Sequence, residues 1–118
     1  MVVDQTSGAH ADRIFHALAD GTRRDIVAHA LGDGHSVSTL AQRYPMSFAA
    51  VQKHVAVLER AGLVTKERRG RERLVRTDID AVQQARTLLD GIEQQWRERM
   101  DRIDDLLATE QRTTGGKR

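Results

Sequence analysis

The side chains with the clearest chemical potential are cationic, and they are gathered in one stretch of the chain. Residues 43–76 contain nine Lys or Arg against three Asp or Glu, whereas residues 77–110 contain four against nine. The net charge of the 118 residues is only +2, so any indication of an anionic partner comes from the distribution of the charges along the chain. A concentrated positive surface attracts phosphate groups, which are the anions of a nucleic-acid backbone.

Much of this positive charge falls in a predicted β-hairpin. β-branched residues follow Gly62, residues 69–71 predict a turn, and residues 72–76 predict the returning strand. The arginines near the tip are Arg68, Arg69, Arg71 and Arg73. We expect them to contact the DNA backbone or the minor groove, because phosphate contacts supply affinity and salt dependence with little sequence information. The alternative is an ordinary solvated hairpin.

The segment before the hairpin predicts a helix with one buried face and one exposed face. Ser47 can cap a helix that runs to about Ala61. Val51, Val55 and Leu58 follow a helical spacing, so they form one inward stripe. The residues expected to contact DNA lie on the other face and its flanks: Ser47, Ala49, Ala50, Gln52, Lys53 and His54.

The chemistry of that exposed face suits the major groove of double-stranded DNA. The alanines allow close approach and can touch thymine methyl groups, while Lys53 can reach guanine or a phosphate and Gln52 can pair with adenine. Ser47 and the free amides of the first turn suit a phosphate. His54 lies closer to the core, where a packed or locally bonded histidine is as well supported as a DNA contact. Phe48 is expected to pack in the core or the turn.

Three shorter helices are predicted ahead of this one. The first is a short helix that ends before Asp20 and has an apolar face of Ile14, Phe15, Leu18 and Ala19. The second runs from Thr22 to Leu31 after an Asp20 cap, and the third from Thr39 to Tyr44 after a Ser38 cap. Pro45 then disfavours helical geometry in the residue before it. A short helix, a three-residue break and a second helix form a helix-turn-helix outline.

A long helix is predicted from about residue 78 to residue 108. Its apolar residues alternate three- and four-residue spacing, the pattern of a coiled-coil seam, with an interruption at Arg99. The helix is longer than a small domain needs for its own core, so we expect the stripe to pack on a second copy of the chain. The alternative is a helix laid across its own domain. The predicted interface residues are Val82, Leu89, Ile92, Trp96, Ile103 and Leu106.

Three strings of residues resemble the ArsR family of bacterial repressors: residues 17–26 (ALADGTRRDI), residues 47–58, and residues 59–64 (ERAGLV). The resemblance covers about residues 12–108. It implies a mainly α fold with a small β-hairpin wing, a winged helix-turn-helix dimerised through its terminal helices. It also implies a repressor that binds operator DNA, expected to be an imperfect inverted repeat, and releases it when a signal arrives.

The chain departs from the family where many members sense their signal. Those members carry cysteines on the helix before the turn, or acidic and histidine ligands on the C-terminal helix. This chain has no cysteine, and His54 is its last histidine. The resemblance is therefore to metal-independent members, with no metal site or cofactor expected and an unknown inducer. The family usually has a serine where Gln52 stands, which implies a different base preference.

The residues leave two other functional classes open and do not suggest a third. A metal-sensing regulator is one alternative, to which His16, His29 and His35 could contribute ligands, although they share no recognised ligand spacing. A helical protein-interaction module would use the long helix and leave the basic hairpin unexplained. An enzyme is not expected, because there is no nucleophile–base pairing, phosphate-binding glycine loop or pair of carboxylates in an apolar setting.

The chain is expected to form one domain over residues 1–118, with an ordered core at about residues 12–108 and frayed polar ends. No apolar run approaches the length of a membrane helix, and the first ten residues lack the pattern of a signal peptide. The absence of cysteine suits a reducing compartment. We therefore expect a cytoplasmic protein with no membrane partner.

Overall fold

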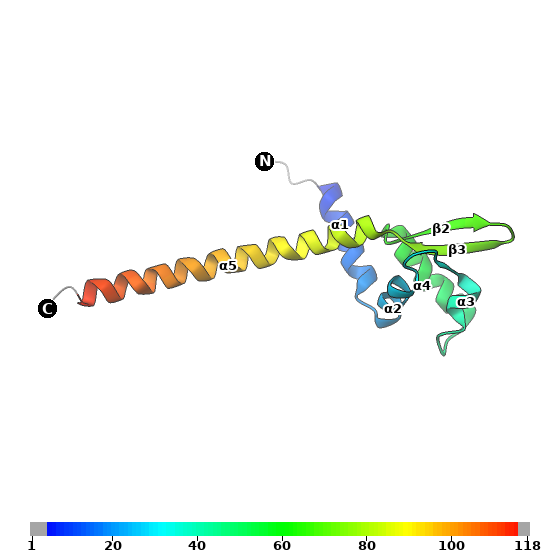
Figure 1. The fold of residues 1–118 in the computed structure, drawn as a ribbon, viewed down its shortest axis with the longest axis horizontal. Helices are drawn as coiled ribbons and strands as arrows, with labels where there is room; N and C mark the ends of the chain where they lie inside the picture. The colour runs from blue at the N-terminus through cyan, green and yellow to red at the C-terminus, as the bar shows by residue number, and fades with distance from the viewer. Residues whose placement is uncertain (1–4, 116–118) are drawn as a thin grey trace. The chain divides into compact units, whose positions relative to one another are not determined.

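The computed structural model describes residues 5–115, with side chains over residues 8–111, and it is mainly helical with one small sheet (Figure 1). The elements in chain order are α1 (Gln5–Leu18), α2 (Gly21–His29), β1 (His35–Ser36), α3 (Val37–Ala41), α4 (Phe48–Arg60), β2 (Val64–Arg69), β3 (Glu72–Thr77) and α5 (Ile79–Gly115). The predicted class, mainly α with a small β-hairpin, is confirmed. The predicted frayed ends are corrected in part, because residues 5–10 are helical; residues 1–4 and 116–118 lie outside the described residues.

The described chain divides after Ala85 into two units. The first contains every element up to β3 together with the first turns of α5. The second is the remainder of α5. The single-domain organisation stays a prediction.

The core of the first unit is built almost entirely from aliphatic side chains. Its largest fully buried members are Ile14, Ile26, Leu40, Leu58, Leu63, Val51, Val55, Val64 and Val75. They come from α1 to α4, from the sheet and, in the case of Leu63, from the connection between α4 and β2. Helices α1 to α4 are therefore each held by an apolar face directed inward. No buried side-chain nitrogen or oxygen among the described residues lacks a hydrogen-bond partner.

Helix starts follow local capping rules, with one correction. Asp20 caps α2 as predicted: its Oδ1 accepts the backbone N–H of Arg23 at 3.0 Å, and this hydrogen bond lowers the pKa of Asp20. The cap of α3 is Ser36, not the predicted Ser38, and its Oγ accepts the backbone N–H of Thr39 at 3.1 Å. The reason is tertiary, since Ser36 is paired with Leu74 of β3 and is held extended there.

The sheet has three antiparallel strands in the order β1-β3-β2. The β2–β3 hairpin matches the prediction, and its tip places Arg68 opposite Arg73 and Arg69 opposite Glu72. Strand β1 was not expected, because a two-residue strand has no periodicity to reveal it. Its approach to β3 requires glycine at position 34, which has φ +82°, since a Cβ there would lie 2.5 Å from the Val75 carbonyl oxygen.

Helix α5 begins one residue from the predicted start and runs past the predicted end at residue 108. Ala81 and Ala85 are buried in the first unit, and Val82 packs partly against its core. Every described side chain from residue 86 to residue 111 is exposed except that of Met100, which is half-buried.

Candidate nucleic-acid interface

Helix α4 is fixed by its cap and by one buried stripe. Ser47 Oγ accepts the backbone N–H of Ala50 at 3.1 Å, which confirms the predicted cap. Val51, Val55 and Leu58 are all fully buried, so the predicted inward stripe is confirmed as well. The orientation of the opposite face follows from this packing.

That opposite face carries most of the residues predicted to contact DNA. Ala49, Gln52 and Lys53 are exposed, together with the cap Ser47. Ala50 is half-buried rather than fully outward. An amide, an ammonium group and a small methyl group are therefore presented side by side, and these groups match hydrogen-bonding and apolar features of base edges.

His54 is half-buried and is engaged within the protein. Its Nδ1 lies 3.2 Å from Nη1 of Arg23, and the guanidinium of Arg23 also donates to the carbonyl oxygens of Ala17 (2.7 Å) and His16 (3.1 Å). Because arginine can only donate, the imidazole Nδ1 accepts. The His54–Arg23 pair thus ties α4 to the last turn of α1, and a DNA contact by His54 stays a prediction.

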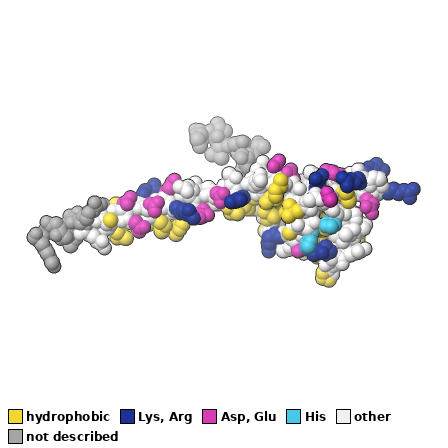
Figure 2. Space-filling model, viewed as in Figure 1, with side chains coloured by type: hydrophobic (Ala, Val, Ile, Leu, Met, Phe, Trp, Pro, Cys, Tyr) yellow, Lys and Arg dark blue, Asp and Glu magenta, His cyan; other side chains and the backbone are white. Residues whose placement is uncertain are grey.

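The hairpin holds the largest group of unneutralised cations in the first unit. Arg68, Arg69, Arg71 and Arg73 are exposed, and none of them forms an ion pair within residues 8–111. Figure 2 shows Lys and Arg side chains gathered at the hairpin end. The two salt bridges of the hairpin, Lys66–Glu59 at 3.8 Å and Arg76–Glu67 at 3.5 Å, lie away from the tip. The tip is therefore free to meet an external anion.

A concave surface joins α4 to the hairpin. Its volume is about 350 Å³, and the residues that line it are Ser36, Val37, Ser38, Phe48, Gln52, Lys66, Arg71, Glu72 and Arg73. It brings together Gln52, Arg71 and Arg73 from the two groups predicted separately. The other predicted residues of both groups, including Lys53, Arg68 and Arg69, lie outside this lining.

The predicted packing of Phe48 in the core or the turn is wrong. Its side chain is 46% exposed, and it belongs to the concave surface rather than to the core or the turn packing. The reason is helical geometry, since Phe48 stands four residues before Gln52 and so shares its outward face. That spacing was the signal in the sequence that could have identified it.

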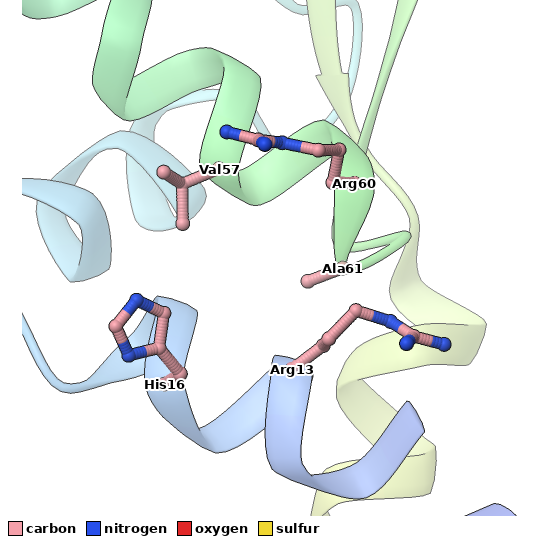
Figure 3. A pocket seen from close by; sticks show the side chains of 5 residues that line it. All are labelled: Arg13, His16, Val57, Arg60 and Ala61. Carbon is pink, nitrogen blue, oxygen red and sulfur yellow. The ribbon is translucent and has the colours of Figure 1, made fainter. Parts of the chain in front are cut away.

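A second hollow lies between α1 and α4, with a volume of about 210 Å³ (Figure 3). Val57 and Ala61 form its apolar wall, and Arg13, His16 and Arg60 complete the lining. The guanidinium of Arg13 points away from the hollow in Figure 3. Its cationic groups therefore do not converge on a common point, as they would in a preformed anion site.

The predicted interface residues of the second unit have exposed side chains that follow one stripe of α5. Leu89 is 55% exposed, Ile92 61% and Trp96 57%, with Ile103 and Leu106 also exposed. Figure 2 shows apolar side chains recurring along this part of α5. Among the described residues no helix is long and apolar enough to span a bilayer. No group of three or more metal-ligating side chains is assembled over the same residues.

Comparisons with known proteins give one consistent result. A family described as a helix-turn-helix domain matches residues 18–67. The HTH-type transcriptional regulator Rv2034 of Mycobacterium tuberculosis is 40% identical over 79 residues, which are 67% of this chain and 74% of that protein. An ArsR-like transcriptional regulator from Rhodococcus sp. RHA1 has a TM-score of 0.76 and 31% identity, over 86% of this chain and 95% of that one.

A solved structure described as a winged helix-turn-helix also resembles this chain. A homodimeric winged helix-turn-helix DNA-binding domain from Mycobacterium bovis superposes with a TM-score of 0.62 over 79% of this chain and 89% of that chain. At 20% identity this likeness shows the fold alone. The predicted winged helix-turn-helix fold is confirmed.

Proposed function

Because this chain belongs to the ArsR family of helix-turn-helix transcriptional regulators, we propose that it is a homodimeric repressor that binds an inverted-repeat operator. The observation that carries the proposal is the concave surface, where Gln52 of α4 meets Arg71 and Arg73 of the hairpin. Base-reading chemistry and phosphate-binding chemistry are adjacent there. Double-stranded DNA likewise presents base edges in its grooves and phosphates along the backbone beside them.

The roles divide between the two elements. Helix α4 enters the major groove, where Gln52 pairs with adenine and Lys53 reaches guanine or a phosphate. The small side chains of Ala49 and Ala50 let the helix backbone approach the bases. Arg68, Arg69, Arg71 and Arg73 contact the adjacent backbone or the minor groove, so they contribute affinity at every sequence.

Dimerisation accounts for the open stripe of α5. Apolar side chains recur at three- and four-residue spacing over turns of α5 whose described side chains from residue 86 onward are exposed, apart from the half-buried Met100. A second copy would cover the same stripe in return, as an isologous interface requires. Two α4 helices then enter successive major grooves roughly 34–36 Å apart, and the operator is an inverted repeat. Occupation of that operator in the cytoplasm blocks transcription until an inducing signal releases the protein.

Selection of bound duplexes from a random pool tests the proposal directly. The expected product is an inverted repeat whose affinity falls steeply as salt rises, bound by a particle of twice the 13.2 kDa chain mass in sedimentation. A pool that shows no enrichment at any salt concentration would exclude specific DNA binding. It would favour a protein-interaction module that uses α5.

Matched substitutions then separate the two roles. Gln52→Ala and Lys53→Ala should relax specificity at particular positions, each at about 1–3 kcal/mol against the preferred base. Arg69→Ala and Arg71→Ala should weaken all duplexes alike and reduce the salt slope by about one. All four side chains are exposed, so thermal unfolding should stay near that of the wild type. If both pairs of variants changed specificity in the same way, the division of roles would be wrong.

A further inference from the structure

Helical geometry places Phe48 on the outward face of α4, but the core makes no use of its aromatic ring. The side chains of Tyr44 and Met46, just before it, pack against the core, whereas Phe48 is absent from that packing and is 46% exposed. Fully burying such a side chain is worth about 1.5–3 kcal/mol, and Phe48 forgoes about half of that stabilisation. An aromatic ring kept half in water, on a surface shared with Gln52 and two arginines, indicates a contact made outside the chain.

We propose, on the basis of the proposed function, that the Phe48 ring contacts a thymine C5-methyl group and so specifies thymine at one position of each half-site. Phe48 is the first residue of α4, directly after the Ser47 cap. Residues at the start of a recognition helix are those that meet base edges. The position of Phe48 therefore matches a base contact rather than a contact far from the groove.

The chemistry of the ring selects the base. A phenyl group neither donates nor accepts a hydrogen bond, so it cannot pair with the polar edges of guanine, cytosine or adenine. The thymine methyl is the apolar group that the major groove displays, and phenylalanine is among the side chains that contact it. The ring therefore favours thymine by contact and opposes the other bases by leaving their polar atoms unpaired.

The neighbours of Phe48 restrict where that thymine lies. Gln52 follows by four residues, so the two side chains lie one helical turn apart on the same face. Gln52 suits adenine, and the thymine read by Phe48 should therefore lie next to the adenine that Gln52 reads. Arg71 and Arg73 line the same concave surface and would hold the backbone of this part of the half-site.

Deoxyuridine scanning of the selected operator tests the contact, because uracil differs from thymine only by the missing methyl group. Each thymine of a half-site is replaced in turn, and affinity is measured for the wild type and for Phe48→Ala. At one thymine the wild type should lose affinity about fourfold, the ratio that corresponds to one buried methyl group at room temperature. Phe48→Ala should bind the thymine and uracil duplexes equally there.

Matched variants keep the test specific. Gln52→Ala should retain the uracil effect, because it removes a different contact on the same face. Phe48→Leu should retain part of it, since an apolar group remains. The proposal is overturned if no thymine is sensitive in the wild type, or if Phe48→Ala keeps the full effect, which would assign the methyl contact to Ala49 or Ala50. Failure of the wild type to bind any operator would instead overturn the proposed function.

Discussion

Hydrogen bonds of individual side chains hold the helix-turn-helix at the middle of α4 and at the turn that precedes it. Arg23 connects the last turn of α1 to His54 of α4. In the turn, the Tyr44 hydroxyl donates to Asp25 Oδ2 at 2.6 Å, which ties the segment before α4 to α2. A DNA-reading helix needs such fixed points, because small displacements misplace every base contact.

The Tyr44–Asp25 hydrogen bond should make stability depend on pH in the alkaline range. Burial first, and then the Asp25 carboxylate, raise the pKa of Tyr44 to about 12, with Arg43 opposing the shift. The folded state therefore keeps the phenolic proton where the unfolded chain loses it, near pH 10. Stability should therefore fall as pH rises from about 10 to about 12. Over that range the thermal unfolding temperature of Tyr44→Phe should fall less than that of the wild type. Equal slopes for the two proteins would contradict this assignment.

Rules that depend on a few neighbouring residues were predictable from sequence at this scale. Asp20 and Ser47 could be identified as caps because each stands alone before a helical pattern. Ser36 and Ser38 satisfy the same local rule, and the choice between them is made by pairing with β3, which lies far along the chain. Phe48 was misplaced because its apolar character was given more weight than its four-residue spacing to the exposed Gln52, which puts it on the outward face of α4.

Among the elements, the short strand β1 links the helix-turn-helix to the wing. It joins α3 to β3 through the pairs His35–Val75 and Ser36–Leu74. Ser36 is at once the last residue of β1 and the cap of α3. The hairpin and the first helix of the helix-turn-helix are therefore held by the same residue, and the concave surface between α4 and the hairpin depends on that link.

A glycine pair tests the importance of β1. Gly34→Ala should destabilise the fold strongly for two reasons. The added Cβ would lie 2.5 Å from the backbone oxygen of Val75, and the alanine would have to adopt a positive φ. Gly32→Ala is the matched control, with φ +77° and no atom within 4 Å of the added Cβ. The control should lose about 1–2 kcal/mol from backbone strain alone, and Gly34→Ala should lose clearly more in urea unfolding. Similar losses of unfolding free energy in both variants would mean that β1 can move away from β3 without destabilising the fold.

Elements with a long, regular pattern were predicted well, and those without one were not. The α4 helix and the hairpin were placed closely because their periods change sharply at Gly62. Strand β1 is too short to show a period. The first turns of α1 were missed because residues 1–10 lack an apolar repeat, although the helix begins at Gln5.

At the scale of the whole molecule, the open stripe of α5 determines how two copies could meet. The seam positions of the second unit are Leu89, Ile92, Trp96, Arg99, Ile103 and Leu106. Five are apolar and one is charged, so the charge discriminates between the two arrangements of a paired helix. In a parallel pair each residue meets its own copy, and two Arg99 guanidinium groups would face one another in the seam.

An antiparallel pair avoids this repulsion and gives every seam residue a suitable residue opposite it. Centred between residues 96 and 99, it opposes Leu89 with Leu106 and Ile92 with Ile103 of the second copy. Trp96 then faces Arg99, and a guanidinium over an indole ring is attracted by about 0.5–2 kcal/mol. The same sequence is self-complementary in this register, which is what a twofold interface requires.

The absence of cysteine from the chain allows this register to be tested with introduced thiols. In the antiparallel pair, position 92 lies eleven residues, or about 16 Å, along the helix from its own copy, which exceeds the reach of a disulfide. Ile92→Cys alone should therefore stay uncrosslinked under mild oxidation, whereas Ile92→Cys combined with Ile103→Cys should form covalent dimers on a denaturing gel. Crosslinking by Ile92→Cys alone would establish the parallel pair, and failure of both variants would show that this stripe does not join two copies. Because both positions are exposed within their own chain, neither substitution should disturb the fold of the first unit, and DNA binding by the reduced proteins serves as the control.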